Sequence, residues 1–203
     1  MLVNPPSELP RQFNASKKLF LTADEHYLHA NIIKYQARPF SGIEEMNNTL
    51  IANSNAIVGQ DDHVIHIGDF SFGHKEDLIR ILRRLNGKHY ILDGSHDKSL
   101  EEYFLMENKP TDIVDKFTIL PKLFEFTYSG KKITLCHYAM ARWWASHHGS
   151  LHFFGHSHGN YEHPGRAIDV GVDVQGYTPI LIDQAIKLAE KKVAYANHPK
   201  RER

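Results

Sequence analysis

The sequence has only one cysteine, Cys136, among its 203 residues. This excludes an internal disulfide and any zinc site built from several cysteines, so a bound metal ion would need histidine and carboxylate ligands. Net charge is also missing, because 24 Lys and Arg residues balance 24 Asp and Glu residues. This balance provides no overall attraction to nucleic acid or to a membrane surface.

Long apolar runs are absent as well. No segment approaches the about 20 apolar residues that a membrane-spanning helix needs. The first ten residues hold Pro5, Pro6 and Pro10 and no apolar core, unlike a signal peptide. We therefore expect a soluble, cytoplasmic protein that has no membrane partner.

Short apolar runs bounded by turn-forming residues predict the strands. In the first half they alternate with amphipathic helices, which is typical of parallel β-α-β units, and in the second half strands predominate. The predicted strands cover residues 18–23, 64–67, 89–92, 113–120, 123–128, 132–136, 151–154 and 167–174. The predicted helices cover residues 28–35, 41–57, 75–85 and a final segment from Asp183 that turns Ile186, Ala189 and Val193 inward.

This order of elements predicts an α/β fold, a four-layer α/β/β/α sandwich of two facing mixed sheets with helices outside. The length fits a single domain of ordinary size. We expect this domain over residues 18–195, after an irregular N-terminal lead-in over 1–17 and before a basic C-terminal tail over 196–203.

Histidine is abundant, with 15 residues, and several lie beside Asp and Gly just after predicted strands. The five clusters are Asp24-x-His26, Gly68-Asp69, Gly94-Ser95-His96-Asp97, Cys136-His137-Tyr138 and Gly155-His156-x-His158. Ligands gather at the carboxyl ends of strands in α/β sheets, so we expect these side chains to meet in one crevice. Residues two apart on an extended chain point the same way, so each pair spaced by one residue would present two ligands together. One cluster arises easily by chance, and His26 alone fits a core histidine, but five in this order favour a site.

Imidazole and carboxylate ligands suit zinc, manganese or iron. The clusters supply too many ligands for one ion, whereas two ions that share a bridging carboxylate would use them. Asp69, at the end of a buried strand, is the residue that we expect between the two ions. Such a pair activates water and stabilises in-line displacement at phosphorus.

The motifs D-x-H, GD, G-x-H-D, H and G-H-x-H, in this order, resemble those of the calcineurin-like metallophosphoesterase superfamily. The resemblance runs from about residue 19 to residue 181, and within the superfamily the chain is most similar to small bacterial and phage predicted phosphoesterases. Segments 29–40, 68–73 and 170–179 support it.

The resemblance implies a role for each matching position. One metal ion would bind Asp24, His26, Asp69 and His158, and the second would share Asp69 and bind His137 and His156. His96 would bind no metal and would protonate the leaving oxygen or steady its charge, with Asp97 orienting its ring. We expect two divalent ions, manganese first, with iron, zinc or nickel as alternatives.

Ser95 departs from the family pattern, in which an asparagine at this position offers its carbonyl oxygen to the second metal. Three explanations stay open: natural variation with water as the replacement ligand, an engineered substitution that slows the enzyme, or a true pseudoenzyme. We expect a weaker second metal site and slower turnover than in relatives with asparagine. Asp169 also stands where asparagine is expected, and either adds negative charge near the site or is exposed.

Substrate contacts are predicted from side-chain chemistry alone. A guanidinium binds phosphate through two parallel hydrogen bonds, so the candidates are Arg38, Arg142 and Arg166, together with Ser95. An aromatic wall for a nucleobase, or else part of the core, is the expectation for Tyr138, Trp143 and Trp144.

The leading hypothesis is a two-metal phosphoesterase that hydrolyses a small phosphomonoester or phosphodiester, with a substrate of nucleotide size favoured. The absence of a basic stripe argues against long nucleic acid as a partner. The alternative is a catalytically impaired module that binds a phosphorylated ligand through one retained metal. We predict no particular oligomeric state.

Overall fold

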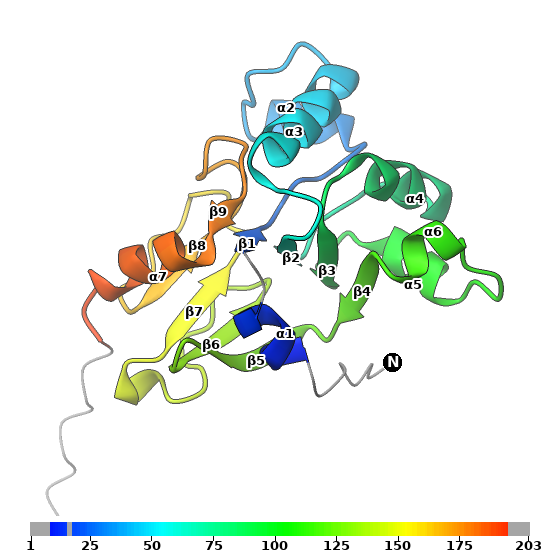
Figure 1. Cartoon of the computed structure of the whole chain (residues 1–203). Helices are drawn as coiled ribbons and strands as arrows, with labels where there is room; N and C mark the ends of the chain where they lie inside the picture. The colour runs from blue at the N-terminus through cyan, green and yellow to red at the C-terminus, as the bar shows by residue number, and fades with distance from the viewer. Residues whose placement is uncertain (1–8, 16–17, 195–203) are drawn as a thin grey trace, which may run out of the picture.

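Two β-sheets lie face to face in the computed structural model, which describes residues 9–15 and 18–194 (Figure 1). The strands are β1 Leu19–Thr22, β2 His63–Ile67, β3 Lys88–Leu92, β4 Phe117–Leu120, β5 Leu123–Tyr128, β6 Lys131–Cys136, β7 Leu151–Phe154, β8 Ala167–Asp169 and β9 Ile180–Leu181. The helices are α1 Leu9–Ala15, α2 Ala30–Tyr35, α3 Ile43–Ile57, α4 Lys75–Arg84, α5 Lys98–Phe104, α6 Thr111–Val114 and α7 Ile182–Glu190, with the 3₁₀ helix η1 Ser146–His148. One sheet has the order β4-β3-β2-β1-β9 and the other β5-β6-β7-β8, which confirms the predicted α/β sandwich of two mixed sheets.

The central strands are buried on both faces. In β3, Tyr90 and Leu92 lie in the core between the sheets, whereas Ile91 packs with side chains of the helices on the opposite face. This double burial is why the strands read as nearly continuous apolar runs. Strands β1 to β4 pair in parallel, as do β6 to β8, so the carboxyl ends of each set lie along one edge. The loops at these edges carry the predicted site.

Helices cover the outer face of the five-stranded sheet (Figure 1). Met46 and Leu50 of α3 and Leu78 and Leu82 of α4 belong to one apolar cluster there. Helix α7 packs against β1 and β9 of one sheet and against β7 and β8 of the other. Within residues 9–15 and 18–194, no helix combines the length and the apolar character that crossing a membrane requires.

The N-terminal segment differs from the prediction. Residues 9–15 form α1, whose Leu9 and Phe13 lie about one turn apart and are both buried in the core between the sheets. The Phe13 ring packs edge-on against Tyr90, with 4.9 Å between the ring centroids. The irregular lead-in predicted over 1–17 is therefore wrong for residues 9–15. The rest of that lead-in and the tail predicted over 196–203 lie outside the described residues.

Three predicted element bounds are also wrong. Ile113 lies in α6 rather than in a strand over 113–120, because its backbone N–H donates to the carbonyl of Pro110 and closes a helical turn. The strand predicted over 167–174 ends at Asp169. Val193, predicted to turn inward, lies beyond the end of α7 and is exposed.

Candidate metal centre

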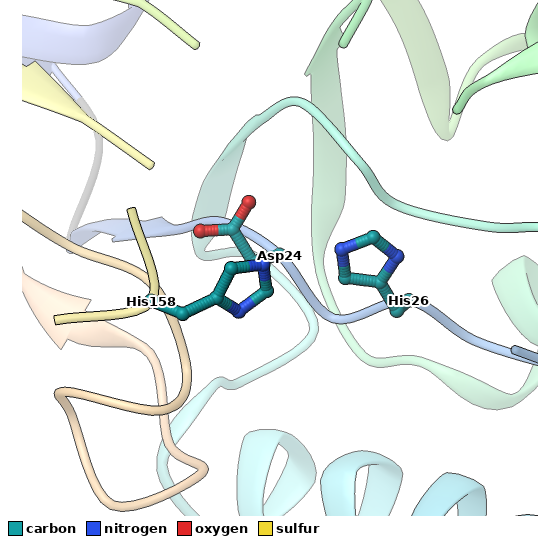
Figure 2. A group of neighbouring side chains, drawn as sticks. All are labelled: Asp24, His26 and His158. Atoms are coloured by element: carbon teal, nitrogen blue, oxygen red, sulfur yellow. The ribbon is translucent and has the colours of Figure 1, made fainter. Parts of the chain in front are cut away.

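The six predicted metal ligands come together from loops that follow β1, β2, β6 and β7. In the first site, defined by Asp24, His26 and His158, the ligand atoms lie within 4.8 Å of one another (Figure 2). In the second site, defined by Asp69, His137 and His156, the ligand atoms meet the same limit. Chain segments more than 130 residues apart therefore meet here, as the hydrogen bond from the His156 N–H to Asp24 requires.

Asp69 lies between the two sites. Its Oδ2 is 3.5 Å from Nε2 of His26 and 3.4 Å from Nε2 of His137. Both nitrogens are buried, and neither has a hydrogen-bond partner among the described residues. A buried polar atom without a partner costs free energy, so the geometry fits a cation that both imidazoles and the carboxylate bind.

The other oxygen of Asp69 is held by the chain. Oδ1 accepts backbone N–H bonds from Ser95 at 2.6 Å and from His96 at 3.0 Å. The Ser95 hydroxyl is 3.1 Å from Oδ1 and 3.0 Å from Oδ2. Ser95, the position at which the sequence departs from the motif it resembles, therefore faces the shared carboxylate.

Partners at Nδ1 orient two of the imidazoles. His137 donates from Nδ1 to the Ile67 carbonyl at 2.9 Å, and His158 donates from Nδ1 to Asp173 at 2.7 Å. A proton fixed on Nδ1 leaves the lone pair of Nε2 free for a metal, which is the usual arrangement around histidine ligands. Asp173 was missed by the sequence analysis, although segment 170–179 had been singled out.

Arg38 supports the first site and is not available for phosphate. Its side chain is buried and forms a bidentate pair with Asp173, at 2.8 and 2.7 Å. It also donates to the carbonyls of Asp24 and Glu25, at 2.7 and 3.0 Å. Because these contacts occupy the guanidinium, the prediction that Arg38 binds substrate is wrong.

The ligand loops have an unusual backbone. A positive φ, between 48° and 66°, occurs at Asp24, His26, Asp69, His156 and His158. The assumption of an extended chain with side chains on one face is therefore wrong for both pairs spaced by one residue. Residues other than glycine rarely adopt this conformation, and it costs free energy that the surrounding packing must offset, as at many functional sites.

Gly68 allows the β2 loop to pass close to its neighbours. Its φ is +85°, and a Cβ atom there would lie 2.6 Å from Nδ1 of His137 and 2.9 Å from the Cα of Gly94. A side chain at this position would therefore collide with both neighbours.

Asp97 has a different task from the predicted one. Oδ2 accepts the backbone N–H groups of Asp69 and Gly94, and Oδ1 accepts those of Phe70 and Ser71. These four bonds use the acceptor capacity of the carboxylate, so it does not hold the His96 ring. Asp97 instead fixes the loop that carries Asp69.

Burial perturbs the ligand charges. It raises the pKa of Asp24 to about 7, although His137 and His158 oppose the rise. It lowers the pKa of His26 to about 3. Burial also disfavours the charged form of His137, but Asp69 and Asp24 outweigh it and raise this pKa to about 9. A divalent cation would compensate the buried carboxylates without requiring charged imidazoles.

Asp169 is buried, which excludes the exposed alternative. Its carboxylate accepts the backbone N–H groups of Gly159 and Gly171, at 3.0 and 2.8 Å. It also adds negative charge near Asp24 and contributes to the raised pKa of that residue.

The other residues predicted to contact substrate differ in their exposure and in the groups that they contact. Arg142 is exposed, and among the described residues its side chain forms no hydrogen bond or ion pair with the six ligands. Arg166 donates instead to the Gly149 carbonyl. Trp143 is a core residue, whereas Tyr138 is exposed with its ring 4.7 Å from that of His156.

Trp144 lies away from the ligands. Its ring is partly exposed and stacks under the ammonium group of Lys132, at 4.6 Å. Lys132 is near the start of β6, and His137 follows the other end of that strand. Trp144 therefore does not belong to the predicted aromatic wall for a nucleobase.

Comparisons with known proteins give relatives without an assigned function. No known protein-family profile matches the chain. The chain is 34% identical over 184 residues to the uncharacterized protein MJ1445 of Methanocaldococcus jannaschii. The alignment covers 86% of this chain and 93% of that protein. The crystal structure of AQ665, a protein of unknown function from Aquifex aeolicus, has a TM-score of 0.61 and 22% identity, and covers 84% of this chain and 98% of that chain. This structural likeness shows a shared fold.

Proposed function

The chain belongs to the same family as the uncharacterized protein MJ1445 of Methanocaldococcus jannaschii, and we propose that it is a cytoplasmic, metal-dependent phosphoesterase. One observation carries the proposal: Nε2 of His26 and Nε2 of His137 are buried without hydrogen bonds among the described residues, and both face Oδ2 of Asp69. The order of the motifs, which resembles the calcineurin-like metallophosphoesterases, supports the choice of phosphoester chemistry.

The first site, with Asp69, would hold one divalent cation, and the second site would hold another, with manganese as the proposed ion. Bound there, the cations would lower the pKa of a water ligand and neutralise charge at phosphorus. His96 is exposed beside the centre, with its ring 5.8 Å from that of His26. It would donate a proton to the leaving oxygen as the bond from phosphorus to that oxygen breaks.

Metal analysis and hydrolysis test the proposal together. Protein stripped with a chelator and reloaded with Mn²⁺ should bind two ions and hydrolyse p-nitrophenyl phosphate or bis-p-nitrophenyl phosphate. His137→Ala should lose an ion and turnover, whereas His148→Ala, an exposed histidine of η1, should lose neither. Failure to bind any divalent ion, or two bound ions without hydrolysis of either ester, would contradict the phosphoesterase.

The second candidate is a module that binds a phosphorylated ligand through one metal. Ser95 favours it, because a hydroxyl beside Asp69 is a poorer neutral ligand than an amide oxygen. One retained ion with no turnover in the same assay would support this candidate.

A further inference from the structure

A pocket of about 500 Å³ adjoins the centre on the side of His96. Ser95 and His96 belong to its wall, and so does the ring of Phe72. The pocket therefore begins at the residue that we propose protonates the leaving oxygen. Its volume is in the range of pockets that bind small molecules, which is about 300–1,000 Å³.

Phe72 gives this pocket a fixed aromatic wall. Half of its side chain is exposed, at 51%. Its ring stacks on that of His29, with 4.3 Å between the centroids and 12° between the planes. Nδ1 of His29 is in turn 3.2 Å from Nδ1 of His26, so this wall is connected to a ligand of the first site. An exposed aromatic ring held by stacking on one side is suited to receive a planar group on its open surface.

The charges of the pocket do not favour a second phosphate. Lys122 pairs with Asp93 at 2.9 Å, and Lys98 lies 3.7 Å from Glu102. Because an acidic partner is close to each ammonium group, the pocket has little uncompensated positive charge. An uncharged planar ring matches this wall better than a polyphosphate does.

We propose that this pocket binds the leaving group of the substrate and that this group is a nucleoside, whose base stacks on Phe72. The inference rests on the proposed phosphoesterase activity and specifies its substrate class as a nucleoside monophosphate. In the reaction, the oxygen of water bonds to phosphorus and the bond from phosphorus to the 5′-oxygen breaks. The proton from His96 goes to that oxygen, so the products are a nucleoside and inorganic phosphate.

Two substrates that share a ribose 5-phosphate unit, one with a base and one without, test the stacking contact. Adenosine 5′-monophosphate and ribose 5-phosphate have the same kind of leaving oxygen, so the ratio of their kcat/KM values reports the base. We expect wild-type protein to prefer the nucleotide and Phe72→Ala to lower the ratio about 10-fold, within the range for loss of one stacked base. Phe72→Tyr should keep the ratio.

Two control variants locate the effect. Trp144→Ala removes a partly exposed aromatic ring near the start of β6 and should leave the ratio unchanged. Tyr138→Ala removes the ring beside His156, a second exposed aromatic ring that also lies near Lys122 of the pocket wall. If Tyr138→Ala lowers the ratio and Phe72→Ala does not, or if wild-type protein shows no preference for the nucleotide, the inference is wrong.

A binding measurement separates this inference from the proposed function. Equilibrium dialysis of Mn²⁺-loaded protein with each of the two compounds gives their dissociation constants. The ratio of these constants reports the preference for the base without requiring turnover. Suppose that neither ester is hydrolysed, that adenosine 5′-monophosphate binds more tightly than ribose 5-phosphate, and that Phe72→Ala removes this difference. The proposed phosphoesterase activity is then wrong, but the proposed binding pocket is supported. Hydrolysis of both esters with equal kcat/KM values and equal binding overturns the subsite alone.

Discussion

The first and second sites use the same kinds of ligand but are supported differently. In the first site, Asp24 and His26 are buried, and His158 is braced by Asp173, which is itself held by buried Arg38. In the second site, His137 is equally buried, but His156 is exposed at the rim beside Tyr138. The Ser95 hydroxyl, 3.0 Å from Oδ2 of Asp69, also belongs to the surroundings of the second site.

The difference indicates how the two sites divide their tasks. A ligand set fixed by buried partners loses little conformational entropy when a metal binds, so the first site should bind its ion more tightly. In the second site, the exposed His156 and the Ser95 hydroxyl leave the metal ion free to exchange with solvent. They also leave it accessible to a phosphoester. We therefore expect sequential loading, with the first site filled before the second.

The largest effect is expected at the residue that both sites share. Asp69→Asn keeps the shape and an oxygen acceptor for the N–H groups of Ser95 and His96, but removes the charge between His26 and His137. Metal affinity at both sites should fall by more than the roughly 10- to 100-fold typical of losing an outer-shell partner. Mn²⁺ titration followed by elemental analysis measures the loss, and Asp115→Asn, at an exposed aspartate, is the control. Retention of two ions in Asp69→Asn would show that the sites are independent.

Removing the brace behind the first site should come next. Arg38→Met leaves Asp173 buried without its bidentate partner, and breaking a buried ion pair costs about 3–5 kcal/mol of unfolding free energy. First-site affinity should also fall by roughly 10- to 100-fold, because His158 loses its orientation. Urea unfolding and Mn²⁺ titration report the two effects separately.

The chain offers a matched control for this variant. Arg83 makes the same bidentate contact with Asp112, at 2.7 and 3.2 Å, but on the surface. Arg83→Met should change stability little, because solvent and salt screen an exposed pair. Equal destabilisation by the two variants would mean that burial of Arg38 does not matter.

Much of the architecture could be predicted from local patterns. Apolar runs that end in Gly and Asp mark strands at their carboxyl ends, and β2 with Gly68 and Asp69 follows this pattern. The sheet edge then brings distant ligands together, because parallel strands end on one side. Helix α1 was missed because its two buried residues, Leu9 and Phe13, give too short a periodic signal.

The supports of the site could not be predicted in the same way. Arg38 and Asp173 lie 135 residues apart, and no local spacing indicates that they pair. Asp97 is adjacent to His96 in sequence, yet backbone N–H groups of another loop occupy its carboxylate. The left-handed backbone conformations of the ligand residues depend on tertiary contacts that offset their free-energy cost. Local residue propensities carry no information on these contacts.

A smaller and selective effect is expected at the rim. His156→Ala removes a ligand of the second site only, so the protein should keep one ion and lose the other, with hydrolysis reduced. Elemental analysis at increasing Mn²⁺ concentration should show one tight ion in the variant and two in wild-type protein. His147→Ala, an exposed histidine of η1, provides the comparison. Loss of both ions from His156→Ala would contradict sequential loading.

The smallest effect, and the only expected gain, is at Ser95. Ser95→Asn introduces a side chain whose carbonyl oxygen can bind a cation, and the backbone N–H that holds Asp69 is kept. We expect second-site affinity and hydrolysis to rise together by less than about 10-fold, because one neutral ligand is added to a set that already includes a carboxylate and two imidazoles. Ser129→Asn, in the hairpin turn between β5 and β6, controls for the substitution itself. If neither affinity nor hydrolysis rises, Ser95 does not weaken the second site and this expectation is wrong.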